Sequence, residues 1–142
     1  MQPRSAREGS NPMIESHWNA DLLAKVFGLL FLAVGAVGFT ANPIVSAQGF
    51  FVVNDLHNYL HIATGVLFLV GALLGAPVTT IRIIAILYAI VAVVGFAFPD
   101  AEMLKGVQLN MADRWLHAGL AIILLLVAFL APIEERLSHA QL

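Results

Sequence analysis

Three histidines and one aspartate in this 142-residue chain have the types and spacing to bind a metal ion. His57 and His61 are four positions apart, and so are Asp113 and His117. Residues i and i+4 lie on one face of a helix, so each pair can present two ligand atoms to the same side. Imidazole and carboxylate donors in a tetrahedral set suit zinc or copper. The candidate metal ligands are therefore His57, His61, Asp113 and His117.

Both pairs belong to blocks that repeat along the chain. Block 54–61 aligns with block 110–117 at an offset of 56 positions, with asparagine first and histidine last in each. Positions 0, +3 and +7 of a helix share one face, so each block forms a polar stripe. Together the two stripes predict a polar cluster of Asn54, His57, Asn58, His61, Asn110, Asp113, Arg114 and His117.

The composition is that of a membrane protein. Hydrophobic residues make up 60% of the chain and charged residues only 11%, and the mean hydropathy is +0.88. Soluble domains carry about 25% charged residues. Four apolar segments, at about 22–40, 54–76, 81–98 and 110–131, approach the length of about 20 residues that crosses a bilayer. This transmembrane domain, 21–132, is flanked by polar tails at 1–20 and 133–142.

The repeat extends beyond the polar blocks. Val34–Phe39 recurs as Val91–Phe96 at an offset of 57, and Pro43 recurs as Pro99. Segments one and two therefore correspond to segments three and four. Because each unit has an even number of spans, both units sit the same way up in the membrane. The predicted fold is an all-α integral membrane four-helix bundle built from two parallel hairpin repeats.

Basic residues predict the orientation. Four spans place both termini on one side, with five basic residues against two on the other. The five are Arg4, Arg7, Lys25, Arg82 and Arg136, and the two are Lys105 and Arg114. This excess places both termini in the cytoplasm and the polar blocks near the outer face. A cleaved secretory signal is the competing interpretation of segment one, and the repeat favours its retention.

The polar stripes allow several functions. His61 lies about 10 Å along its helix from Asn54, below the headgroups, where polar side chains should face the bundle interior. The cluster can be a structural hydrogen-bonded network or the metal site. Alternatively, His61 and His117 can be the axial ligands of one haem. A proton pathway is a fourth possibility, although the remaining halves of these two helices are apolar.

Several other chemistries have no support in the sequence. The chain has no cysteine, which excludes disulfides and thiolate sites. Its net charge of −2 gives no indication of nucleic-acid binding. The serines lie outside the apolar segments and in no Gly-x-Ser-x-Gly frame. We therefore predict that the protein is not an enzyme.

The two polar motifs also resemble a known family. The His-Asn-x-x-His block at 57–61 and the Asn-x-x-Asp-x-x-Leu-His block at 110–117 are similar to those of domain-of-unknown-function family 4383. The resemblance covers about residues 25–130. It implies a four-span protein of the bacterial inner (plasma) membrane, and it implies no reaction, substrate or cofactor.

The leading hypothesis is a small structural or accessory membrane protein with a buried polar cluster. The alternative is a zinc-, copper- or haem-binding protein in redox or metal handling. Convergence of the histidine nitrogens on one point would favour metal, and hydrogen bonds to backbone carbonyls would favour structure. The expected partner is the lipid bilayer, and the sequence also allows a membrane complex or a homo-oligomer formed through the glycine-rich face of the first helix. Gly65 and Ala121 are expected to let the second and fourth helices approach closely.

Overall fold

The computed structural model describes residues 19–98 and 106–130. Within them lie four helices, α1 (Ala20–Gly38), α2 (Asp55–Leu73), α3 (Pro77–Ala97) and α4 (Met111–Leu130), and two strands, β1 (Val45–Ser46) and β2 (Phe51–Val52). Nearly all of the predicted tail 1–20, the tail 133–142 and Lys105 lie outside the described residues.

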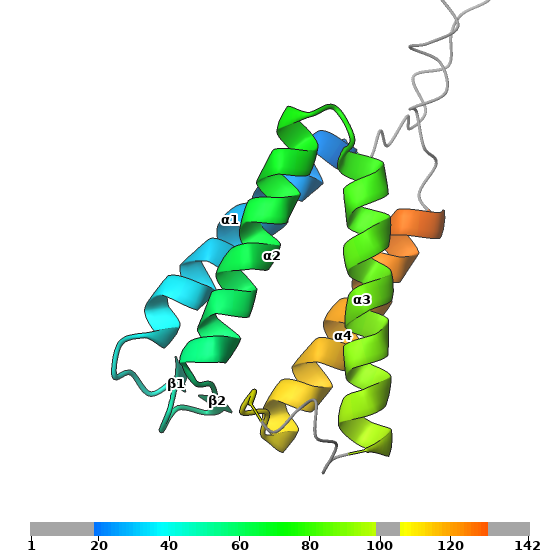
Figure 1. Ribbon diagram of the computed structural model, residues 1–142. Coiled ribbons are helices and arrows are strands. Elements are labelled where there is room, and N and C mark those ends of the chain that lie inside the picture. Colours follow the sequence, from blue (N-terminus) through cyan, green and yellow to red (C-terminus); the bar gives the residue numbers. More distant parts are fainter. Residues whose placement is uncertain (1–18, 99–105, 131–142) are drawn as a thin grey trace, which may run out of the picture.

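All four helices are long and apolar enough to cross a membrane. Helices α1 and α2 form one antiparallel hairpin, and α3 and α4 form the other (Figure 1). The strands and the start of α4 lie at one end of the bundle, and the turn between α2 and α3 lies at the other. The predicted all-α membrane bundle of two hairpins is thus confirmed.

The connection between α2 and α3 is shorter than the sequence predicts. The third apolar segment is predicted to begin at about residue 81, but α3 begins at Pro77. Proline suits the first helical position because its missing N–H has no partner there and its φ is already helical. The turn is made by Gly75, whose φ of 71° is a left-handed conformation that glycine adopts without steric cost.

Helices α1 and α2 pack through glycines. A Cβ atom on Gly65 would lie 2.7 Å from the carbonyl oxygen of Gly28, and one on Gly35 would lie 2.9 Å from the carbonyl oxygen of Asn58. Gly65 therefore faces α1, and the expectation that it faces the fourth helix is wrong. Because the glycine-rich face of α1 is used inside the hairpin, it is not available for self-association.

The two hairpins meet around aromatic rings. Phe31 of α1 and Tyr88 of α3 are equivalent at the offset of 57, and their ring centroids are 5.4 Å apart. Phe68 and Leu124, from α2 and α4, are fully buried in the same core. The hydrophobic core thus lies where the two repeats contact each other.

The connection between α1 and α2 contains the two strands, which the sequence analysis missed. They pair in parallel, with Val45 opposite Phe51. Asn42 supports the connection, since its Oδ1 accepts hydrogen bonds from the N–H groups of Ile44 and Val45. This ordered connection places the main chain of residues 50–52 beside the start of α4.

Candidate metal site

Helices α2 and α4 begin with equivalent asparagine caps. Asn54 Oδ1 accepts a hydrogen bond from the His57 N–H at 3.1 Å. Asn110 Oδ1 accepts one from the Asp113 N–H at 3.0 Å. An N-cap side chain satisfies one of the backbone donors left free at a helix start. Each cap therefore fixes the first turn that carries a predicted site residue.

The same asparagines join the two repeats. Asn54 Nδ2 donates to the Gly106 carbonyl at 2.8 Å, and Asn110 Nδ2 donates to the Phe50 carbonyl at 2.8 Å. Each acceptor lies four residues before the other asparagine, so the two bonds are equivalent by the repeat. The start of α2 is thus hydrogen-bonded to the segment that precedes α4, and the start of α4 to the segment that precedes α2.

A second equivalent pair of contacts distinguishes His57 from Asp113. His57 Nδ1 lies 2.8 Å from the Gln108 carbonyl oxygen, and the backbone of Val52, at the matching position, lies near the Asp113 carboxylate. Asp113 Oδ2 also accepts from the Asn110 N–H at 3.3 Å, completing a reciprocal cap. One oxygen of the Asp113 carboxylate is therefore engaged in capping its own helix.

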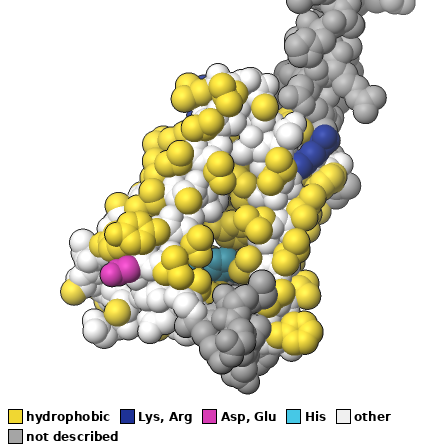
Figure 2. All heavy atoms as spheres, viewed as in Figure 1, with side chains coloured by type: hydrophobic (Ala, Val, Ile, Leu, Met, Phe, Trp, Pro, Cys, Tyr) yellow, Lys and Arg dark blue, Asp and Glu magenta, His cyan; other side chains and the backbone are white. Residues whose placement is uncertain are grey.

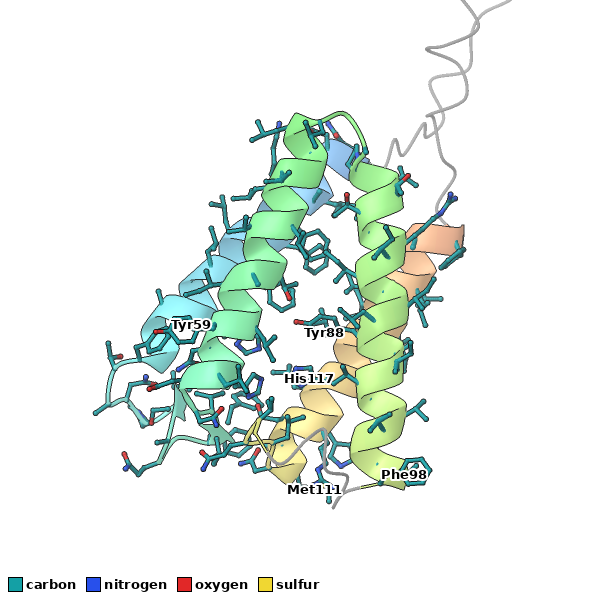
Figure 3. All side chains as sticks on the ribbon, in the orientation of Figure 1. Tyr59, Tyr88, Phe98, Met111 and His117 are labelled. Atoms are coloured by element: carbon teal, nitrogen blue, oxygen red, sulfur yellow. The ribbon has the colours of Figure 1, made fainter. Side chains whose placement is uncertain are left out.

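The remaining three predicted ligands come together. One ligand nitrogen from each of His57, His61 and His117 lies within 4.8 Å of the other two. The three residues are 3%, 7% and 6% exposed. His117 and Tyr88 both point into the space between the hairpins (Figure 3). The structure thus brings two histidines of α2 and one of α4 to a common point.

Hydrogen bonds define the tautomers of two of these rings. His57 Nδ1 contacts the Gln108 carbonyl, and His117 Nδ1 contacts the Asp113 carbonyl at 2.7 Å. A carbonyl oxygen only accepts, so in both rings Nδ1 carries the proton and Nε2 keeps its lone pair. The convergence that favours a metal site and the carbonyl contacts that favour a structural role therefore both occur at His57 and His117.

His61 differs from its two neighbours. Its Nδ1 is buried and has no hydrogen-bond partner within the described part of the chain. A buried polar atom without a partner carries a free-energy penalty of about 1–3 kcal/mol. Ligation of an ion is one way in which such a nitrogen is satisfied.

The spacing of the three nitrogens is close to what a small ion requires. Nitrogens bound to tetrahedral zinc at about 2.0–2.1 Å are about 3.4 Å apart. Small rotations of the imidazoles would bring nitrogens that lie within 4.8 Å onto one ion. The arrangement can therefore hold a metal ion without a change in the helices.

The haem alternative fits this packing less well. A bis-histidine haem needs its porphyrin between the two axial imidazoles. The rings of His61 and His117 have centroids 6.2 Å apart, but the His57 ring lies 4.5 Å from the first and 5.6 Å from the second. A porphyrin between them would displace His57, so the geometry favours a single ion.

Two other predicted cluster residues lie away from the histidine nitrogens. Asn58 is 1% exposed and packs against Gly38, and its Oδ1 has no partner among the described residues. Arg114 lies beside Gly95 with its Nε buried. Among the described residues, the Asn110 N–H donates to the Asp113 carboxylate, and no ion pair joins this carboxylate to Arg114.

Sequence reasoning missed two aromatic residues that pack against the site. The Phe31 ring lies 5.7 Å from the His61 ring, and the Tyr88 ring lies 5.5 Å from the His117 ring and nearly parallel to it. Tyr88 is the one tyrosine in an otherwise apolar segment, and it is equivalent to Phe31 at the offset of 57. Extending the repeat alignment through these helices would have identified both.

Fold and site together define a four-span membrane protein with a buried three-histidine cluster between two repeated hairpins. The family model described as Domain of unknown function (DUF4383) matches residues 22–130. The chain belongs to this family, as its motifs predict. No curated protein and no solved structure gives a significant match to the chain.

Proposed function

We propose that this membrane protein binds one transition-metal ion through His57, His61 and His117. Zinc is the first candidate and copper the second, because both accept neutral imidazoles in low-coordinate sites. The observation that carries the proposal is the convergence of three buried imidazole nitrogens within 4.8 Å. Metal handling or redox chemistry at the membrane would follow from such a site.

The surroundings of the histidines support this role. Ligating histidines usually donate their second ring N–H to a carbonyl or carboxylate, which fixes the ring and raises its basicity. The contacts of His57 with the Gln108 carbonyl and of His117 with the Asp113 carbonyl are of this kind.

A structural or accessory role is the second candidate function. It is favoured by the reciprocal bonds of Asn54 with Gly106 and of Asn110 with Phe50, which hold the hairpins together without any ion. In this case the histidines would contribute only packing and hydrogen bonds. Neither candidate requires an enzymatic reaction.

The excess of basic residues supports an orientation with both termini in the cytoplasm of a bacterium and the site near the outer face of its inner membrane. The chain has no cysteine, so single cysteines can report the topology. In intact cells, a membrane-impermeant maleimide should label Gln48→Cys directly and Gln141→Cys only after permeabilisation. The opposite pattern would place the site at the cytoplasmic face.

The decisive experiment for the metal site is elemental analysis with an absorption spectrum on detergent-purified protein prepared without chelator. Wild type should carry or take up about one zinc or copper ion, and a His61→Ala, His117→Ala double variant should lose it. A Soret band that disappears in the double variant would instead establish haem.

A matched control separates ligation from stability. Leu124 of α4 is fully buried, so Leu124→Ala should destabilise the bundle while leaving all three histidines in place. This variant should retain the metal. If wild type neither carries nor takes up zinc or copper, the metal proposal fails and the structural role remains.

A further inference from the structure

The three histidines form an incomplete coordination shell. Zinc prefers four ligands, and three protein ligands with an open fourth position are typical of reactive rather than structural zinc sites. His57 and His61 come from α2 and His117 from α4. At the same level α1 and α3 present the rings of Phe31 and Tyr88. Those two helices therefore supply no imidazole or carboxylate to the cluster.

The nearest candidates for a fourth protein ligand are already engaged. The Asp113 carboxylate accepts a hydrogen bond from the Asn110 N–H at 3.3 Å. The Tyr88 hydroxyl lies 3.4 Å from Thr64 Oγ1 and donates to it. Among the described residues, the group of metal-binding side chains that converge here contains only the three histidines.

The cluster is also reachable from outside the bundle. Figure 2 shows histidine side-chain atoms at the floor of a hollow between the two hairpins, surrounded by hydrophobic side chains. The exposed fractions of His61 and His117, 7% and 6%, are small but not zero. A small molecule entering by this hollow would reach a histidine side chain of the cluster.

We infer that the bound ion keeps one exchangeable coordination position, which takes a small monodentate donor such as water or a small anion. This inference rests on the proposed function, since it requires the ion. A metal ion in such a site polarises the donor and makes bound water more acidic. The apolar walls select for small ligands that can shed their hydration.

Cobalt(II) provides the test, because its visible spectrum depends on coordination number and ligand type. Detergent-purified wild type is loaded with cobalt and titrated with azide and, separately, with 4-methylimidazole. We expect a visible spectrum that is absent from the His61→Ala, His117→Ala double variant. We further expect at least one of the two probes to change it in a saturable way.

The outcomes separate the two proposals. If cobalt gives no histidine-dependent spectrum, the proposed metal site itself fails. If the spectrum is present but responds to neither probe, the metal site stands and the open position is overturned. An Asp113→Asn variant that gains a response absent from wild type would identify the Asp113 carboxylate as the fourth ligand, which also overturns the inference.

Discussion

The two hairpins share one frame but carry different chemistry. Each has an asparagine cap that bonds to the other repeat, and each has a histidine seven residues later that packs on an aromatic ring. Their difference lies in the first turn, where His57 of α2 corresponds to Asp113 of α4. The histidine joins the three-histidine cluster, whereas the aspartate caps its own helix. The two repeats thus share their asparagine caps and their second histidine, whereas the equivalent residues His57 and Asp113 have different roles.

The hairpins also differ in how closely their helices approach. In the first, Gly28 and Gly65 bring the backbones of α1 and α2 together. The equivalent positions of the second hairpin are Ala85 and Ala121, both buried. A methyl group is therefore accommodated between α3 and α4 where none fits between α1 and α2.

The largest expected effect is a difference in zinc affinity between a variant of His57 and a variant of Asp113. Loss of a hydrogen-bond partner of a ligand lowers metal affinity about 10–100-fold, so loss of a ligand should exceed that. We expect His57→Ala to weaken zinc binding by more than about 100-fold. Asp113→Asn keeps a capping oxygen and the Asp113 carbonyl, and should change the affinity by less than about 10-fold. Calorimetric zinc titration of both variants measures the difference, and similar losses would refute the division of roles.

The next largest expected effect is a difference in stability between alanine variants of Gly38 and Gly95, which are equivalent at the offset of 57. A Cβ atom on Gly38 would collide with the buried Asn58 side chain, whereas one on Gly95 would lie 3.8 Å from Arg114 Cγ, an ordinary contact. Gly38→Ala should therefore destabilise the protein by about 1–3 kcal/mol. Gly95→Ala should be neutral or stabilising by up to about 1 kcal/mol, since alanine favours helix. Thermal unfolding in detergent measures both, and equal effects would contradict the packing described.

The two asparagine caps should behave alike. Asn54→Ala and Asn110→Ala each remove a cap and a bond to the other repeat, and each should lower stability by about 1–2 kcal/mol. Asn54→Asp keeps the capping oxygen but loses the donor to Gly106, so its effect should be intermediate. Chemical unfolding curves provide the comparison. A loss of stability confined to one of the two alanine variants would show that the two asparagines do not contribute equally.

The smallest expected effect concerns Lys25 and Arg82, which are equivalent at the offset of 57. Arg82 Nε donates to the Ala128 carbonyl at 3.1 Å, joining α3 to α4. Lys25 pairs with Asp21 of its own helix, and both side chains are about half exposed. Arg82→Ala should cost about 0.5–1.5 kcal/mol, and Lys25→Ala at most about 0.5 kcal/mol. Unfolding measurements that reverse this order would show that the surface pair matters more than the link between helices.

Much of the architecture could be predicted from local sequence signals. Length and apolarity identify the four spans, and the offset of 56 residues relates the polar blocks of α2 and α4. The start of α3 was predicted too late in the sequence. Proline breaks a helix at interior positions but is favoured at the first helical position, where Pro77 lies. The strands were missed because two-residue pairings leave no periodic pattern.

The candidate site was predicted only in part. Helical periodicity placed His57, His61 and His117 on two polar stripes, and the structure brings their nitrogens together. It could not tell that Asp113 would lie outside the group of converging side chains, since that depends on contacts between helices that are distant in sequence. Nor could it reveal the Gln108 carbonyl, because a backbone acceptor has no side-chain signature.

By itself, the sequence determined the number of spans, the repeat and the face of each helix that is polar, because hydropathy and helical period are local properties of the chain. Only the tertiary structure decided which polar groups meet. That outcome depends on how closely each pair of helices packs, with Gly65 turned toward α1, and on how each helix is rotated about its axis. A different rotation of α4 about its axis would leave the same sequence pattern and a different site.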